Sequence, residues 1–208
     1  MKIIKLFVLG DSISMHYGPY LKEYLDERFD YDRKRDKGIS KKDLLRPVGG
    51  NGGDSRRVLE YLLSAKKAGR LNYDYILLNC GLHDIKRDSK TKALQVPERE
   101  YGQNLELAVR LLKKAGPSII WVRLTHVDDK IHRARCKGFY RLNKDVNNYN
   151  RIADRIMNKS GVKTIDLNSF TKKLKERHFV DHVHFTKTIR ALQAAHIAGY
   201  LMREITNR

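Results

Sequence analysis

The sequence predicts an α/β fold, a three-layer sandwich in which a five-stranded parallel sheet lies between two layers of helices. Strand-like and helix-like segments alternate from one end of the 208-residue chain to the other. The strand-like segments are short apolar runs, and no linker, repeat or low-complexity segment divides the chain. Alternation of this kind implies right-handed βαβ crossovers. We expect a single domain over residues 1–208.

The five expected strands are apolar runs bounded by glycine, polar or charged residues. They cover residues 3–9, 44–48, 73–80, 118–124 and 162–167. Runs that are apolar at consecutive positions suit strands that are buried on both faces. The simplest arrangement places them in the flavodoxin-like order 2-1-3-4-5.

The expected helices lie between these strands and repeat apolar residues at spacings of three and four. Pro97 suits a first helical turn, and Gly69 and Gly116 suit helix ends. The helices cover residues 18–28, the stretch from 55 to 69, 97–116, the stretch from 146 to 161, and 186–205.

The chain is strongly basic. It holds 43 Lys and Arg residues against 24 Asp and Glu, a formal net charge of +19 at pH 7. These residues are dispersed over the whole chain, which favours a solvated charged surface, with attraction to an anionic partner as the alternative. No nucleic-acid-binding motif accompanies the charge, so we do not expect nucleic acid as a partner.

Several classes of protein are disfavoured by the sequence. No segment approaches the ~20 apolar residues that span a bilayer, and the N-terminal apolar stretch lacks a small-residue cleavage site. We therefore expect no transmembrane segment and a cytoplasmic location. Cys80 and Cys136 do not form a disulfide framework, and Cys136 with His132 is too small a set for a metal site. We expect no metal and no cofactor, and no feature specifies an oligomeric state.

Four polar or glycine-rich segments follow the expected strands or precede the last helix. They are Gly10-Asp11-Ser12, the glycine-rich run 49–53, Gly81-Leu82-His83-Asp84 and Asp181-His182-Val183-His184. The carboxyl ends of parallel strands meet at one edge of an open α/β sheet, where sites collect. A nucleophilic serine needs a base and an acid that orients it, and Ser12, His184 and Asp181 supply these groups. We expect Asp11 to cap a helix and Asp84 to fix its loop.

Three of these segments, together with Gly52-Gly53-Asp54-Ser55 at the end of the glycine-rich run, resemble the four sequence blocks of the GDSL, or SGNH, hydrolase family, in the family's order and over nearly the whole chain. One departure stands in the third block, where His83 occupies the usual asparagine position. The resemblance implies that Ser12 is the nucleophile, that His184 is the base and that Asp181 orients it. It also implies an oxyanion hole formed by the backbone N–H groups of Ser12 and Gly53 and by the His83 side chain.

The implied reaction is hydrolysis of a carboxylic ester through an acyl-enzyme. We expect a short acyl group such as acetyl, carried by a small molecule or glycan that is anionic or contains a sugar. The alternatives are an acyltransferase or thioesterase with the same triad, and a basic binding module that His83 has made inactive. Residues 125–142, with Arg123, Arg133 and Arg135, are a candidate lid or binding wall.

Overall fold

The sheet has the predicted architecture. The computed structural model describes residues 2–35, 47–131 and 138–206. Its five parallel strands follow the order β2-β1-β3-β5-β7, which is 2-1-3-4-5 along the chain, so the predicted fold class and strand order are confirmed. The strands are β1 (Ile4–Leu9), β2 (Phe29–Arg33), β3 (Tyr75–Leu78), β5 (Ser118–Val122) and β7 (Lys163–Ile165).

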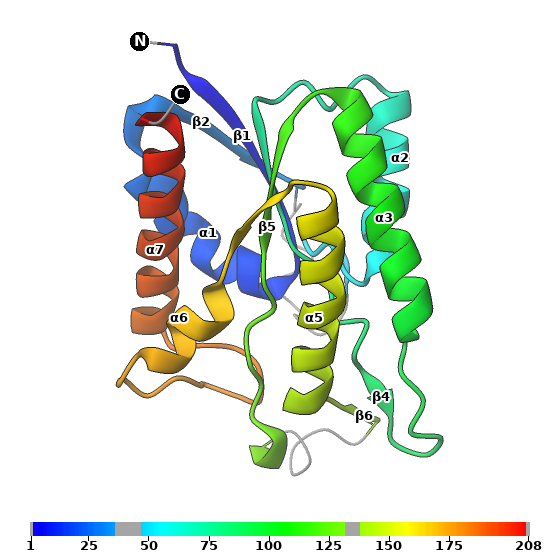
Figure 1. Ribbon diagram of the computed structural model, residues 1–208. Coiled ribbons are helices and arrows are strands. Elements are labelled where there is room, and N and C mark those ends of the chain that lie inside the picture. The colour runs from blue at the N-terminus through cyan, green and yellow to red at the C-terminus, as the bar shows by residue number, and fades with distance from the viewer. Residues whose placement is uncertain (1, 36–46, 132–137, 207–208) are drawn as a thin grey trace.

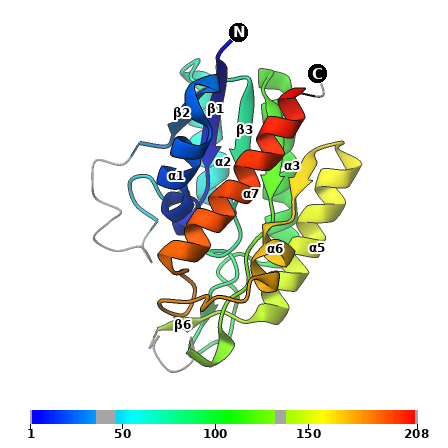
Figure 2. The same cartoon turned by 90° about the vertical axis from the view of Figure 1, so that its left-hand side faces the viewer.

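Helices cover both faces of this sheet (Figures 1 and 2). One layer holds α1 (Ser12–Tyr24), α6 (Leu167–Lys173) and α7 (Lys187–Thr206), and a short 3₁₀ turn (Asp26–Arg28) follows α1. The other layer holds α2 (Ser55–Lys67), α3 (Glu98–Ala115) and α5 (Asn143–Lys159). The core lies between the layers, where β3 is buried along its whole length and Trp121 of β5 is fully buried. Within the described residues no helix combines the length and apolarity needed to cross a membrane.

The second strand differs from the expectation. β2 begins directly after the helix expected at 18–28, in a stretch where no strand was expected, and it pairs with β1 from Ile4↔Phe29 to Val8↔Arg33. The expected strand at 44–48 falls mostly outside the described residues, and Pro47 and Val48 are irregular. β2 is an edge strand buried only at Phe29, so its sequence lacks the continuous apolar run of a central strand.

A second, two-stranded sheet lies beyond the carboxyl edge of the main sheet (Figure 1). It pairs β4 (Arg87–Asp88) with β6 (Phe139–Tyr140) in antiparallel register. The Arg87 guanidinium forms two hydrogen bonds to the Asp145 carboxylate of α5, at 2.6 and 2.8 Å. This bidentate pair joins the loop after β3 to the start of α5.

Candidate active site

Ser12 lies at the junction between β1 and α1. It is the first residue of the helix, and Asp11 caps it by accepting a hydrogen bond from the Ile13 backbone N–H at 2.9 Å. The prediction that Asp11 is a helix cap is therefore confirmed. Backbone N–H groups in the first turn have no acceptor within the helix, so the Ser12 N–H belongs to an electropositive helix end.

His184 connects Ser12 to Asp181. Its Nε2 lies 2.9 Å from Ser12 Oγ, and its Nδ1 lies 2.6 Å from Asp181 Oδ2. With Nδ1 donating to the carboxylate, Nε2 is left to accept the serine hydroxyl proton. The structure thus brings together three predicted residues from opposite ends of the chain.

The Asp181 carboxylate is held in its ionised form. Burial opposes ionisation, but hydrogen bonds from the His184 ring and from the backbone N–H groups of His184 and Val183 outweigh it. Together they hold the pKa of Asp181 well below its ordinary value. A carboxylate fixed in this way stabilises an imidazolium formed beside it.

His16 packs against the His184 imidazole, a contact that was not predicted from the sequence. It lies one helical turn after Ser12, with its ring centroid 4.9 Å from that of His184. Burial, together with the charges of Arg190 and His184, lowers the pKa of His16 to about 3. A neutral ring can therefore pack beside His184 without repelling an imidazolium. The sequence feature that could have indicated His16 is its spacing of four residues from Ser12, which places both side chains on one face of a helix.

His83 is buried beside the glycine-rich loop. The side-chain amide nitrogen of Asn51 lies 3.5 Å from His83 Nε2. Burial, and then the charges of Lys86 and Arg141, hold the pKa of His83 well below its ordinary value, so the ring is neutral. Gly81 starts this loop with φ of +141°, and a Cβ there would lie 2.5 Å from the Leu124 side chain. Only glycine fits that position.

The glycine-rich loop places Gly53 next to Asn51. Gly53 has φ of +76°, and a Cβ there would lie 2.7 Å from the Pro47 side chain. Its N–H donates to Asn51 Oδ1 at 2.9 Å. The predicted oxyanion donor is therefore hydrogen-bonded to a side chain, and it must share or exchange this bond to reach a substrate. The contacts of Asn51 with Gly53 and His83 were not predicted, because Asn51 lies inside the glycine-rich run 49–53 and only the glycines of that run suggested a role.

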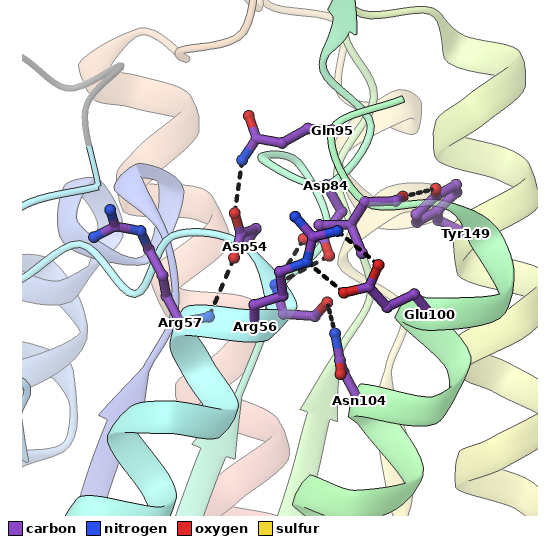
Figure 3. A network of polar contacts seen from close by, with 10 residues as sticks. Asp54, Arg56, Arg57, Asp84, Gln95, Glu100, Asn104 and Tyr149 are labelled. Carbon is purple, nitrogen blue, oxygen red and sulfur yellow. Dashed lines mark hydrogen bonds and ion pairs between the residues drawn. The ribbon is translucent and has the colours of Figure 1, made fainter. Parts of the chain in front are cut away.

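A polar network around Asp84 fixes the loop after β3 (Figure 3). Both carboxylate oxygens of Asp84 lie 3.0 Å from the Ser55 backbone nitrogen at the start of α2. The Asn104 amide donates to Ser55 Oγ at 3.0 Å, and Arg56 pairs with Glu100 of α3. The prediction that Asp84 holds its loop through backbone hydrogen bonds is confirmed. Burial raises the pKa of Asp84 to about 7 despite the bonds from Ser55.

Arg141 is a buried cation at this site that the sequence did not distinguish from the many other basic residues. It is 2% exposed, it donates from Nε to the Leu82 carbonyl oxygen, and it lies 5.2 Å from the centre of the Phe139 ring. Burial raises the pKa of Asp11, and the positive charge of Arg141 partly opposes this increase by favouring the ionised carboxylate. Arg141 therefore supports the segment that carries His83.

Arg123 is one of the residues suggested for a lid or binding wall, and the structure places it in ion pairs. Arg123 forms these ion pairs with Asp154 at 3.2 Å and Asp166 at 2.6 Å, so its side chain has a structural role. Arg133 and Arg135 lie outside the described residues. Within the part of the chain that is described, no group of three or more His, Cys, Asp or Glu side chains could hold a metal ion.

A parallel α/β sheet with contacting serine, histidine and aspartate side chains at its carboxyl edge defines the arrangement of a serine hydrolase. The model of the GDSL-like lipase/acylhydrolase family matches residues 8–191, and the chain belongs to that family. It is accordingly an ester-hydrolysing enzyme. No curated protein matches the chain significantly.

Solved structures share this fold over nearly the whole chain. A lipase/acylhydrolase from Enterococcus faecalis is 14% identical, with a TM-score of 0.69 and coverage of 97% of each chain. A GDSL-like lipase from Bacteroides thetaiotaomicron is 13% identical, with a TM-score of 0.67 and coverage of 96% of this chain and 88% of that one. An acetyl xylan esterase from Geobacillus stearothermophilus is 17% identical, with a TM-score of 0.66 and coverage of 99% and 97%.

Proposed function

We propose that this enzyme hydrolyses a short-chain carboxylic ester through an acyl-enzyme formed on Ser12. The observation that carries the proposal is the continuous chain of contacts from Ser12 Oγ through His184 to Asp181, at 2.9 and 2.6 Å. These distances allow direct proton transfer between the serine and the imidazole.

In the proposed reaction, Ser12 Oγ attacks the ester carbonyl carbon while His184 Nε2 takes the hydroxyl proton. The imidazolium then returns a proton to the departing alcohol, which leaves an acyl group on Ser12. Water repeats the sequence: His184 removes its proton, the oxygen attacks the acyl carbon, and Ser12 leaves as the free hydroxyl. Asp181 stabilises the imidazolium in both halves.

We assign three donors to the oxyanion position. They are the Ser12 N–H in the first turn of α1, the Gly53 N–H, which must first share or exchange its bond to Asn51 Oδ1, and the neutral His83 ring. Preorganised donors of this kind act in a site from which water is excluded, and they carry a large share of acyl-transfer catalysis. Ser12 and His184 are only 6% and 3% exposed, which fits such a site.

The proposed substrate is an acetyl or similarly short acyl ester of a carbohydrate or anionic small molecule. The acetyl xylan esterase among the structural neighbours and the net charge of +19 support this class. Transfer of the acyl group to another acceptor, or cleavage of a thioester, would use the same triad and differ in which nucleophile reaches the acyl-enzyme.

Activity and covalent labelling test the proposal together. The protein should hydrolyse p-nitrophenyl acetate and should react with a fluorophosphonate probe at Ser12. Ser12→Ala should lose both, whereas Ser64→Ala, which removes an exposed serine of α2, should keep both. Equal rates or equal labelling in the parent and Ser12→Ala proteins would refute the proposed nucleophile. A product formed on an added alcohol at the expense of free acetate would favour acyl transfer.

A further inference from the structure

A cavity of about 860 Å³ lies along the edge strand β2, outside the contacts that form the catalytic triad. It is lined by β1, β2, residues 34–35, α2 and the loop before β3. Lys5 pairs with Asp30 and Phe7 with Asp32, so these four side chains share one face of the sheet. The cavity lies within the usual volume range of small-molecule sites, roughly 300–1,000 Å³.

Aromatic rings form one wall of this cavity. Phe7 stacks on Tyr61 of α2 with an interplanar angle of 1° and a centroid distance of 6.0 Å. The Phe7 ring also lies 4.8 Å from Tyr73. Lys34 Nζ lies 5.9 Å from the centre of the Tyr61 ring. Phe7 is itself only 3% exposed, so the half-buried Tyr61 and Tyr73 rings that it supports offer the flat apolar surface to a planar or sugar ring.

Basic side chains dominate the remaining lining. Five of them, against two acidic ones, give the cavity a net charge of +3: Lys5, Arg33, Lys34, Arg35 and Arg70 against Asp30 and Asp32. The Asp32 carboxylate accepts hydrogen bonds from the Tyr73 hydroxyl at 2.7 Å and from the Arg33 backbone N–H at 2.8 Å. The positive excess favours an anion, and guanidinium groups suit phosphate oxygens.

We propose that this cavity binds a compound in which a phosphate group is joined to a ring, such as a nucleotide or a sugar phosphate. The ring packs against the tyrosine wall, and the phosphate pairs with the basic side chains. The site stands on its own lining residues, so it does not depend on the proposed esterase chemistry.

The cavity is physically joined to the catalytic loop. Lys34 Nζ donates to the Asn51 carbonyl oxygen at 2.9 Å. The Arg33 guanidinium donates to the carbonyl oxygens of Gly50 at 3.2 Å and Ser14 at 3.1 Å. Asn51 in turn contacts both Gly53 and His83. A phosphate in the cavity therefore comes from one of two sources: the anionic part of the ester substrate, or an effector that acts on this loop.

Direct binding to the Ser12→Ala protein tests the site without catalysis. Isothermal titration with AMP and with ribose 5-phosphate should show saturable binding to one site, tighter than inorganic phosphate or adenosine alone. Arg70→Gln should weaken AMP binding at least about tenfold, because a charged hydrogen-bonding partner is lost. Tyr61→Leu should weaken AMP more than ribose 5-phosphate. Lys114→Gln, a matched loss of charge at an exposed position on α3, should bind like the parent.

The proposal is overturned if neither compound binds saturably at millimolar concentration, or if Lys114→Gln weakens binding as much as Arg70→Gln. Arg70 is exposed, so its replacement keeps the test valid even if Tyr61→Leu lowers the melting temperature.

Two kinetic arms then separate the sources of the phosphate. A substrate role predicts that O-acetyl-AMP has a lower KM than O-acetyladenosine, and that Arg70→Gln removes the difference. An effector role predicts that AMP changes kcat for p-nitrophenyl acetate.

Discussion

Replacing His83 with asparagine should preserve most esterase activity, whereas replacing it with alanine should remove most of it. The Asn51 amide nitrogen can only donate, and its oxygen is engaged by the Gly53 N–H, so His83 Nε2 is the acceptor across 3.5 Å. The neutral His83 ring then carries its proton on Nδ1. That atom is buried and has no hydrogen-bond partner among the described residues. An unpaired buried donor is suited to an oxyanion that forms only during the reaction.

The expected magnitude follows from the loss of one such donor. His83→Ala removes the Nδ1–H and should lower kcat by roughly 10²–10³-fold, or about 3–4 kcal/mol of transition-state stabilisation. In His83→Asn the amide nitrogen is bonded to Cγ, as Nδ1 is in histidine, so a donor stays at the same reach from the backbone. Because burial keeps the His83 ring neutral, the neutral amide also matches its charge. We expect kcat within about tenfold of the parent.

The assay is steady-state hydrolysis of p-nitrophenyl acetate by the parent and the asparagine, alanine and glutamine variants at position 83. His83→Gln is the matched control, because it carries the same amide one carbon farther from the backbone and should resemble alanine. Thermal unfolding of each variant separates loss of a donor from loss of fold. The reasoning is wrong if the alanine variant retains the parent kcat, or if the asparagine variant is as slow as alanine.

Three further predictions concern the groups around this donor. Asp181→Asn should lower kcat about 10⁴-fold with unfolding unchanged, because His184 loses its orienting carboxylate; a kcat near that of the parent would contradict the triad. Arg141→Met should lower kcat more than it alters KM, and it should destabilise the fold by roughly 3 kcal/mol, because the Leu82 carbonyl and the buried Asp11 lose their cation. Steady-state kinetics and urea unfolding measure the two effects. An unchanged kcat would contradict the inference that Arg141 supports the segment that carries His83. Burial raises the pKa of Asp84 to about 7. The native state therefore keeps a proton that the unfolded chain releases, and stability of the parent relative to Asp84→Asn should fall between about pH 4 and 7, by up to roughly 4 kcal/mol. Urea unfolding across that range would contradict this if the difference between the two proteins stayed constant.

The sequence was sufficient for the architecture, and it singled out the three side chains of the proposed triad, which the structure brings into contact. Central strands such as β3 are buried on both faces, so their sequences are continuous apolar runs that can be recognised directly. Ser12 begins α1, and Asp181 and His184 lie three residues apart in the loop before α7, so residue type and position could be combined. The edge strand β2 has one neighbouring strand, and its alternating charged residues resemble a loop.

The rest of the site depends on contacts that no local pattern encodes. Arg141 resembles the many solvated basic residues of the chain, and its burial against the Leu82 carbonyl is evident only from the tertiary structure. Asn51 has its role because the loop folds back so that one side chain meets both Gly53 and His83. Such roles arise from tertiary packing, so sequence spacing alone does not predict them.

Ser12 and His184 are hydrogen-bonded although they are 172 positions apart in the chain. The bond joins the first helix to the loop before α7, and α7 itself packs along α1 (Figure 2). Contacts with such large sequence separation carry a high loop-closure entropy and tend to form late in folding. Under the proposed mechanism, hydrolytic activity therefore reports completion of the whole fold, and a chain arrested before its last helix docks would carry Ser12 without its contact to His184. Refolding followed by ester cleavage would monitor this final docking step, while circular dichroism would follow the earlier gain of helices.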